Sequence, residues 1–509
     1  MLSLLASLAL ASKGQETQLT VQADQSGPVI NKNIYGQFSE HLGHCIYDGI
    51  WVGPDSPIPN TNGYNTAVME ALKNLKVPLL RWPGGCFADE YHWKDGIGPV
   101  EKRPSMYNSH WGGVVENNHF GTHEFLNMCE MLGIEPYVCL NVGSGTVQEA
   151  MEWVEYMTSD ASSPMANLRR ANGRDKPWKV HYIAVGNESW GCGGDMRPEF
   201  YADNFRRFNT FIKNYQGGPE NAIQRVACGP NDANYEWTDT LMKLAGKDMD
   251  GLSLHYYTIP SGDWKKKGSA TAFSRDEYFN TLGNTLKMEE LIEKHSAIMD
   301  KYDPEKRVGL AVDEWGIWTD VEPGTNPGFL FQQNSMRDAV LAALNLHIFQ
   351  AHADRVTIAN IAQMVNVLQA MILTDHDKIV LTPTYHVFEM LNVHQGATSL
   401  PIKLTSAYLP GTSQKIPTVS ASASRDASGK IHISLVNTSL DGAVTVACNV
   451  VGADLHAPVG RILTAADMTA HNTFDAPHMV EPVAFNGATV SGGSLNVVLP
   501  PLSVVVLSL

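Results

Sequence analysis

Residues 181–190 read HYIAVGNESW, and residues 308–315 read VGLAVDEW. Each stretch is a short apolar run, rich in β-branched residues, of the kind that forms a buried strand. The first run is followed by Glu188 and the second by Glu314. Acidic side chains directly after buried strands are typical of a parallel sheet whose carboxyl edge carries a functional site. These two stretches therefore favour an α/β fold.

The same pattern recurs along most of the chain. The predicted strands are Ile34–Phe38, Pro78–Trp82, Pro136–Val142, His181–Gly186, Arg225–Gly229, Gly251–Tyr256, Val308–Val312 and Arg355–Ile361. Between them lie amphipathic segments with helical spacing, such as Thr66–Leu75, Thr122–Leu132 and Phe200–Tyr215. Eight strand–helix alternations predict a (β/α)8 TIM barrel over residues 30–395. A doubly wound open sheet is the alternative, but no Gly-rich phosphate loop follows the first strand.

The pattern changes after residue 395. Helical periodicity disappears, and short alternating strands separated by turn residues are predicted at Lys430–Val436, Ala443–Val450, Ala488–Val490, Leu495–Leu499 and Ser503–Leu507. We therefore expect residues 396–509 to form an all-β sandwich, jelly-roll-like in class. The strand-like residues 17–29 precede the barrel and are expected to join this sandwich.

The first residues, 1–16, are interpreted as a leader or signal peptide. They contain the short apolar run MLSLLASLALAS, which ends in an Ala-Leu-Ala cleavage-like site but lacks a basic start. Two localisations follow. The protein is secreted or periplasmic if this leader is a signal peptide, and cytoplasmic otherwise.

Composition narrows the class of partner. The 509 residues carry a formal net charge of −16, which argues against nucleic acid or an anionic membrane as a partner. The seven cysteines are odd in number, scattered and without a CxxC motif, so they indicate neither a disulfide scaffold nor a zinc site. We expect most of them to be buried, and we expect no metal and no cofactor.

The acidic residues after two of the strands point to a reaction class. Strands four and seven lie on opposite sides of a barrel, so Glu188 and Glu314 face each other across its mouth. Retaining cleavage of a glycosidic bond needs two carboxyl groups about 5–5.5 Å apart, one donating a proton and one attacking. Tyr257, near the end of strand six, is placed to hydrogen-bond Glu314. This pairing predicts a retaining glycoside hydrolase.

Longer motifs resemble one family closely. The segments 34–43 (IYGQFSEHLG), 81–87 (RWPGGCF), 95–99 (DGIGP), 186–188 (GNE), 313–315 (DEW) and 360–363 (NIAQ) are similar to the α-L-arabinofuranosidases of glycoside hydrolase family 51. The resemblance continues through residues 472–477 (NTFDAP) in the tail. It covers nearly the whole chain after the leader.

The resemblance implies a role for each site residue. Glu188 is the acid/base and Glu314 the nucleophile. The other implied contacts surround the sugar: Glu40 and Asn187 hold hydroxyls, His255 and Tyr257 support the carboxylates, Gln363 closes the pocket, Trp111 faces the leaving sugar and Trp318 flanks the ring. Cys86 stands where many members carry Asn, and a thiol is a poorer partner for a sugar hydroxyl than an amide.

The implied activity is the exo-acting removal of terminal arabinofuranosyl residues from hemicellulose or oligosaccharides, in a homo-oligomer, often a hexamer. Two alternatives remain at this point. An endo-β-glucanase or xylanase of the same clan uses the same glutamates in an open cleft, and a non-catalytic carbohydrate-binding protein uses the tail as its binding module. The tail shows no exposed row of Trp or Tyr, which favours a structural role for it.

Overall fold

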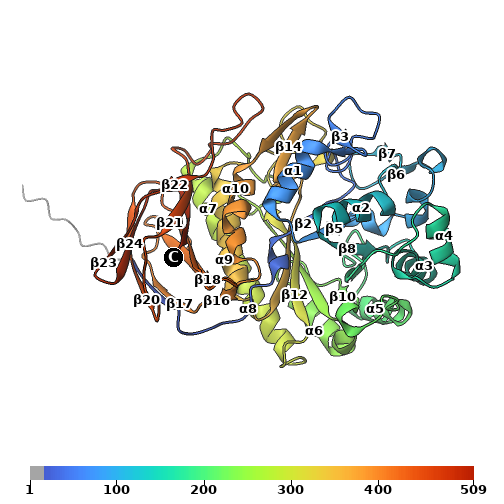
Figure 1. Cartoon of the computed structure of the whole chain (residues 1–509), viewed down its shortest axis with the longest axis horizontal. Coiled ribbons are helices and arrows are strands. Elements are labelled where there is room, and N and C mark those ends of the chain that lie inside the picture. Colours follow the sequence, from blue (N-terminus) through green and yellow to red (C-terminus); the bar gives the residue numbers. More distant parts are fainter. Residues whose placement is uncertain (1–16) are drawn as a thin grey trace, which may run out of the picture.

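The computed structural model describes residues 17–509, and the predicted leader 1–16 lies outside the described residues. Two parts lie side by side in Figure 1: a β-rich part with the last strands of the chain and, on the other side, a barrel surrounded by helices. No helix among the described residues is both long and apolar enough to cross a membrane.

The barrel is closed by eight parallel strands. In chain order they are β2 (Gly36–Phe38), β5 (Leu79–Trp82), β8 (Glu135–Leu140), β9 (Tyr182–Val185), β10 (Gln224–Ala227), β11 (Gly251–Thr258), β12 (Gly309–Ile317) and β13 (Val356–Ile361). Each pairs with its neighbours in sequence order, and β13 pairs with β2 to close the ring. The predicted TIM barrel is confirmed, and every one of its strands falls on a predicted run.

Helices surround the barrel. They are α1 (Thr66–Leu75), α2 (Thr122–Leu132), α3 (Val147–Thr158), α4 (Pro164–Ala171), α5 (Pro198–Phe211), α6 (Tyr235–Ala245), α7 (Arg275–Thr285), α8 (Lys287–Asp300), α9 (Met336–Ala351) and α10 (Pro383–Leu391). Gly133 ends α2 in a left-handed conformation (φ +69°), which glycine adopts without steric cost. Short hairpins extend the loops: β3 (Asn60–Thr61) with β4 (Tyr64–Asn65), β6 (Met106–Asn108) with β7 (Val114–Glu116), and β14 (Ile372–Asp375) with β15 (Lys378–Leu381).

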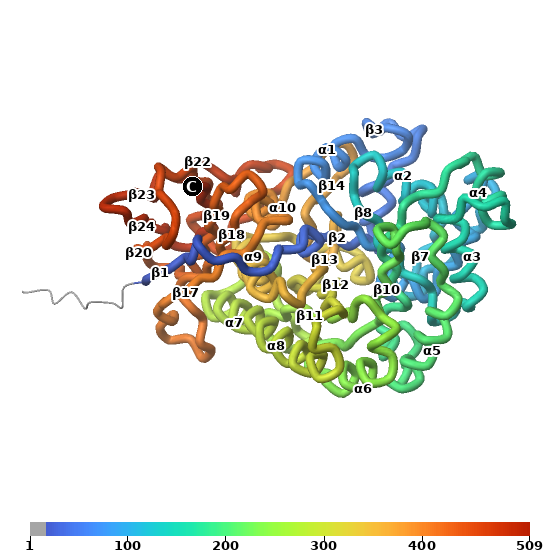
Figure 2. The backbone as a smooth tube through the Cα atoms, turned by 60° about the horizontal axis from the view of Figure 1, so that its bottom comes forward, coloured from blue at the N-terminus to red at the C-terminus, as the bar shows by residue number. Residues whose placement is uncertain are grey.

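The tail forms two packed sheets, in agreement with the predicted all-β domain. One sheet has the order β17 (Ile402–Thr405), β1 (Thr17–Gln22), β20 (Val444–Val451), β24 (Ser494–Leu499) and β23 (Ala488–Ser491). The other has the order β16 (Thr398–Ser399), β18 (Val419–Arg425), β19 (Ile431–Asn437), β25 (Ser503–Ser508), β21 (Val459–Thr464) and β22 (Val483–Phe485). Figure 2 shows the chain leaving β1 in this domain and crossing to β2 in the barrel.

Helix α9 joins the two parts. All but the last of its residues are buried, because one side contacts the barrel and the other contacts β18 and β19. Its His347 places Nδ1 2.9 Å from Ser420 Oγ and Nε2 2.9 Å from Ser434 Oγ. His394 contacts the same Ser434 at 3.0 Å. Helix and sheet are therefore connected by buried polar contacts as well as by apolar packing.

Two local expectations need correction. Strand seven does not end at Val312, because β12 pairs with β11 as far as Ile317, across an irregularity in the register. Glu314 therefore lies inside a strand. The third predicted helix ends at Phe211 and not at Tyr215, because Ile212 is already extended (ψ 101°).

Candidate active site

Glu188 and Glu314 meet at the mouth of the barrel. Glu314 lies in β12 beside His255 of β11, and Glu188 follows β9. One oxygen of each carboxylate and one ring nitrogen of His255 all lie within 4.8 Å of one another. The two predicted glutamates are thus brought together, at a separation near that of retaining glycosidases and below the 6.5–9.5 Å or so of inverting ones.

The carboxylate of Glu314 is held from both ends. Its Oε1 atom accepts a hydrogen bond from Arg81 Nη1 at 2.7 Å, and its Oε2 atom accepts one from the hydroxyl of Tyr257 at 3.0 Å. Both partners are buried. Charge-assisted bonds of this kind are stronger than neutral ones, so they fix the orientation of the carboxylate.

Glu188 lies at a sharp turn after β9. Its backbone is in the left-handed region (φ +38°), directly after Asn187 and Gly186 (φ +85°). Loss of hydration raises the pKa of its carboxyl group, and the negative charge of Glu314 raises it further, although His255 opposes the shift. A carboxyl group with a raised pKa beside an ionised one is the arrangement that proton donation requires.

His255 lies between the glutamates and Asp313. Its Nδ1 atom is 2.9 Å from Glu188 Oε1 and 3.5 Å from Glu314 Oε2, and its Nε2 atom is 3.2 Å from Asp313 Oδ1. Burial disfavours the imidazolium, but the three carboxylates outweigh burial and raise the pKa of His255 to about 10. The ring is therefore a cation at neutral pH.

Glu40, at the end of β2, organises a second polar cluster. Its Oε1 atom accepts hydrogen bonds from the backbone N–H of Gly85 (2.9 Å) and Phe87 (3.1 Å) and from Trp111 Nε1 (2.9 Å). Its Oε2 atom accepts one from Gln363 Nε2 at 2.8 Å. Burial raises the pKa of Glu40 to about 7, and the charge of Glu314 contributes. Trp111 lies in the turn between β6 and β7 and contacts Glu40 by its ring N–H.

These side chains line one pocket. Its wall includes most of the predicted site residues together with apolar ones: Glu40, Leu42, Gly85, Cys86, Trp111, Glu188, Tyr257, Glu314, Trp318, Leu330, Gln363 and Leu368. Trp318 packs edge-on against Tyr257, with ring centroids 5.1 Å apart. His255 and Asn187 lie behind this wall, where they contact Glu188 and Arg81.

The expectation for Cys86 needs correction. Cys86 and Cys192 form a disulfide with a Cα–Cα distance of 5.5 Å, so Cys86 has no free thiol for a sugar hydroxyl. The remaining five cysteines of the chain are unpaired and buried. An odd number of scattered cysteines gives no pairing by spacing, whereas the fold brings the loops after β5 and β9 together.

Three residues behind the site had no role in the sequence interpretation. Arg81 donates to Asn187 Oδ1 at 2.6 Å as well as to Glu314. Asp313 accepts a hydrogen bond from Tyr137 at 2.8 Å, and Asp89 accepts three backbone N–H bonds, including one from Asn187 at 3.1 Å. A signal for Arg81 exists in the sequence, since an arginine between Leu80 and Trp82 is out of place in a buried strand unless a carboxylate pairs with it.

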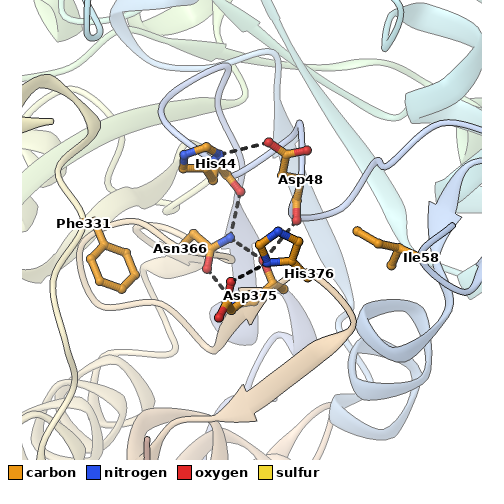
Figure 3. A pocket seen from close by; sticks show the side chains of 8 residues that line it. His44, Asp48, Ile58, Phe331, Asn366, Asp375 and His376 are labelled. Atoms are coloured by element: carbon orange, nitrogen blue, oxygen red, sulfur yellow. Dashed lines mark hydrogen bonds and ion pairs between the residues drawn. The ribbon is translucent and has the colours of Figure 1, made fainter. Parts of the chain in front are cut away.

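A larger cavity lies apart from the glutamate pair. It has a volume of about 370 Å³ and is lined by His44, Asp48, Ile58, Phe331, Asn366, Thr374, Asp375 and His376. Figure 3 shows Asn366 at its centre, where the side-chain amide donates to the His44 carbonyl (3.0 Å) and to Thr374 Oγ1 (2.7 Å). The two carboxylates of this cavity, Asp48 and Asp375, are exposed and lie beside His44 and His376. Glu188 and Glu314 meet in the smaller pocket, which is therefore the candidate active site.

Family models and curated relatives identify the family of the chain. The model described as Alpha-L-arabinofuranosidase 1 domain matches residues 71–278, and that described as Alpha-L-arabinofuranosidase C-terminal domain matches residues 313–503. The chain is 55% identical, over 507 residues, to a Bacteroides ovatus protein named intracellular exo-alpha-L-arabinofuranosidase. That alignment covers 99% of this chain and 98% of the relative.

Solved structures give the same result. The GH51 arabinofuranosidase from Xanthomonas axonopodis pv. citri has a TM-score of 0.94 and 53% identity, covering 97% of this chain and 100% of that one. The arabinose complex of α-L-arabinofuranosidase from Thermotoga maritima has a TM-score of 0.86 and 30% identity, with the same coverage. This chain therefore belongs to the α-L-arabinofuranosidases of glycoside hydrolase family 51.

Proposed function

We propose that this protein is an exo-acting, retaining α-L-arabinofuranosidase in which Glu314 is the nucleophile and Glu188 the acid/base. The observation that carries the proposal is the approach of the two carboxylates to within 4.8 Å. At this separation Glu314 reaches the anomeric carbon directly, and no water fits between the carboxylate and the sugar.

In the first step Glu188 protonates the glycosidic oxygen while Glu314 attacks the anomeric carbon. Its raised pKa favours a protonated Glu188 before the reaction. Arg81 and Tyr257 orient the attacking carboxylate. They keep it beside the anomeric carbon, where positive charge develops in the transition state. The product of this step is a covalent arabinosyl-enzyme, and the aglycone leaves with the proton.

In the second step Glu188 acts as a base. The ester on Glu314 carries no charge, so the repulsion that raised the pKa of Glu188 is removed. The cationic His255, 2.9 Å from Glu188 Oε1, then favours its ionised form. Ionised Glu188 takes a proton from water, which attacks the arabinosyl carbon and releases arabinose with the starting anomeric configuration.

The cluster around Glu40 is proposed to bind the arabinofuranose. Glu40 Oε1 and Oε2 are held by Trp111 and Gln363, so the carboxylate is fixed before a sugar hydroxyl arrives. Trp318 forms an aromatic wall beside Tyr257. The B. ovatus relative is named an exo-alpha-L-arabinofuranosidase, which supports cleavage at chain ends over cleavage within a chain.

A comparison of substrates tests the exo-acting assignment. The enzyme is expected to release arabinose from 4-nitrophenyl α-L-arabinofuranoside and from arabinosylated xylo- and arabino-oligosaccharides, with products identified by chromatography. Shortening of an unsubstituted β-glucan or xylan, without release of arabinose, would instead support the endo-acting alternative. Binding without any turnover would support the non-catalytic alternative.

Assembly and location remain predictions. The expected homo-oligomer, a hexamer by family resemblance, is checked by sedimentation of the purified protein. The B. ovatus relative is named intracellular, which supports the cytoplasmic location for this chain. Fractionation of cells with detection of the mature N-terminus distinguishes it from the secreted or periplasmic one.

A further inference from the structure

The disulfide between Cys86 and Cys192 joins two loops at the mouth of the barrel. Cys86 begins the short helix Cys86–Asp89 after β5, and Cys192 lies four residues after Glu188. The bond spans 106 residues of sequence. Both cysteines are partly exposed, whereas the other five are buried. A reductant in solution can therefore reach the Cys86–Cys192 disulfide.

The disulfide touches the proposed acid/base directly. Cys192 Sγ lies 3.5 Å from Glu188 Oε2 and 4.0 Å from Asn187 Nδ2, and Cys86 lines the pocket with both glutamates. A disulfide sulfur carries no hydrogen, so the contact with Glu188 is packing and not a hydrogen bond. Reduction changes that: a Cys192 thiol gains a proton that it can donate to Glu188 Oε2.

The backbone of Glu188 needs a restraint of this kind. Its φ of +38° lies in the left-handed region, which a non-glycine residue keeps only when the surrounding structure holds it there. The Glu188 carbonyl accepts the N–H of Gly191 at 2.7 Å and of Gly193 at 3.1 Å, which folds the chain back so that Cys192 lies over Glu188. The disulfide ties this turn to the loop after β5.

A second brace is independent of the disulfide. Asp89 accepts backbone N–H bonds from Val142 and Gly143, both at 2.8 Å, and from Asn187 at 3.1 Å. The loops after β5, β8 and β9 thus stay connected when the sulfur–sulfur bond is broken. Reduction is expected to loosen the turn that carries Glu188 without unfolding the barrel.

We propose that the Cys86–Cys192 disulfide is a positioning element for Glu188, so that the reduced enzyme keeps its fold and its nucleophile but loses efficient proton transfer. The inference rests on the acid/base role proposed for Glu188. Reduction by dithiothreitol breaks one S–S bond, forms two thiols and leaves the reagent as its cyclic disulfide, so electrons and protons balance. The new hydrogen bond from the Cys192 thiol favours the Glu188 carboxylate, so a smaller fraction of Glu188 is protonated when the substrate binds.

The test compares oxidised and reduced enzyme on two substrates. On an arabino-oligosaccharide, whose leaving group needs a proton, kcat/KM is expected to fall about 10- to 100-fold after reduction, the loss typical of a misplaced catalytic group. On an arabinofuranoside with a dinitrophenyl leaving group, which needs little protonation, the loss is expected to be less than about threefold. Mass spectrometry after an acid quench confirms that the two thiols are free, and reoxidation is expected to restore the activity.

Variants separate positioning from other effects. The double variant Cys86→Ser with Cys192→Ser is expected to match the reduced enzyme and to ignore the reductant. Cys448→Ser, which changes a buried free cysteine in β20, is expected to respond to reductant as the parent enzyme does. Because reduction acts on the folded native chain, the test stands even if the double variant fails to fold.

Two results overturn the inference. One is an unchanged ratio of the two kcat/KM values when both thiols are free. The other is an equal loss on both substrates together with a loss of the thermal transition, which indicates unfolding. Glu188→Ala serves as the reference: if it shows the leaving-group dependence and reduction does not, the inference fails alone. If Glu188→Ala lacks that dependence, the proposed function fails as well.

Discussion

Replacement of Arg81 by alanine is expected to lower both stability and activity. Arg81 is buried, and its guanidinium donates to Glu314 Oε1 at 2.7 Å and to Asn187 Oδ1 at 2.6 Å, with Asp313 3.6 Å from Nε. Alanine leaves Glu314 without its nearest cation and leaves Asp313 with His255 as its one close cationic partner. Arg81 is the one charged residue of β5, so no neighbour on the strand replaces its positive charge.

The magnitudes follow from these contacts. Removal of one member of a buried ion pair costs about 3–5 kcal/mol in the free energy of unfolding. A charge-assisted hydrogen bond to the nucleophile contributes about 1.5–3 kcal/mol, so its loss lowers kcat/KM by roughly 10- to 150-fold. Arg81→Lys keeps the charge but reaches only one of the two partners, because lysine lacks the planar fork of arginine. Its loss is expected to be smaller than that of Arg81→Ala.

Arg355→Ala is the matched control. Arg355 is also buried and pairs with Asp303 at 2.9 Å and with Asp300, but it precedes β13 at the opposite end of the barrel. It is expected to lose similar stability while its kcat/KM per folded molecule stays unchanged. Stability is measured by urea unfolding and activity on 4-nitrophenyl α-L-arabinofuranoside below the unfolding range. Parent-like kcat/KM in folded Arg81→Ala would refute the role of this ion pair in catalysis.

Glu188→Ala is expected to lose activity mainly on substrates with poor leaving groups, and azide should restore part of the turnover by replacing the activated water; equal losses on good and poor leaving groups would contradict the acid role. Burial lowers the pKa of His347 to about 3 and that of His394 well below its usual value. Below about pH 6.5 both rings are therefore neutral in the folded protein but protonated in the unfolded chain. Stability should therefore fall as pH drops from about 6.5 toward 4, by about 1.4 kcal/mol per pH unit for each histidine, and the double variant His347→Gln with His394→Gln should flatten that slope. Urea unfolding at several pH values checks this, and an unchanged slope would show that neither ring is kept neutral.

The barrel could be predicted because its information is local. Each barrel strand is an apolar run ending near polar residues, and the helix Thr122–Leu132 is followed by Gly133. Strands of the sandwich were predicted less completely. β18 reads VSASASR, a sequence of small residues with weak strand preference, and four of its seven residues are buried in a strand that α9 contacts. Its structure depends on a tertiary contact that no short window contains.

The candidate site also has a part that the sequence predicts and a part that it does not. Glu188 and Glu314 are recognisable because acidic residues within or directly after buried apolar runs are uncommon, and the order of the runs along the barrel sets their positions. The disulfide between Cys86 and Cys192 and the bonds of Arg81 join loops and strands more than 100 residues apart in sequence. Such pairings depend on the shape of the barrel mouth, which spacing alone does not specify.

The central claim is that Glu314 attacks the sugar while Glu188 serves as acid and base. The most direct measurement is proton NMR during the first turnovers, combined with mass spectrometry of enzyme labelled by a slow-leaving fluorinated arabinofuranoside. Double displacement predicts that the first arabinose formed keeps the anomeric configuration of the substrate and that the label resides on the peptide containing Glu314. An inverted first anomer, or a label on Glu40 or Glu188, would contradict the account.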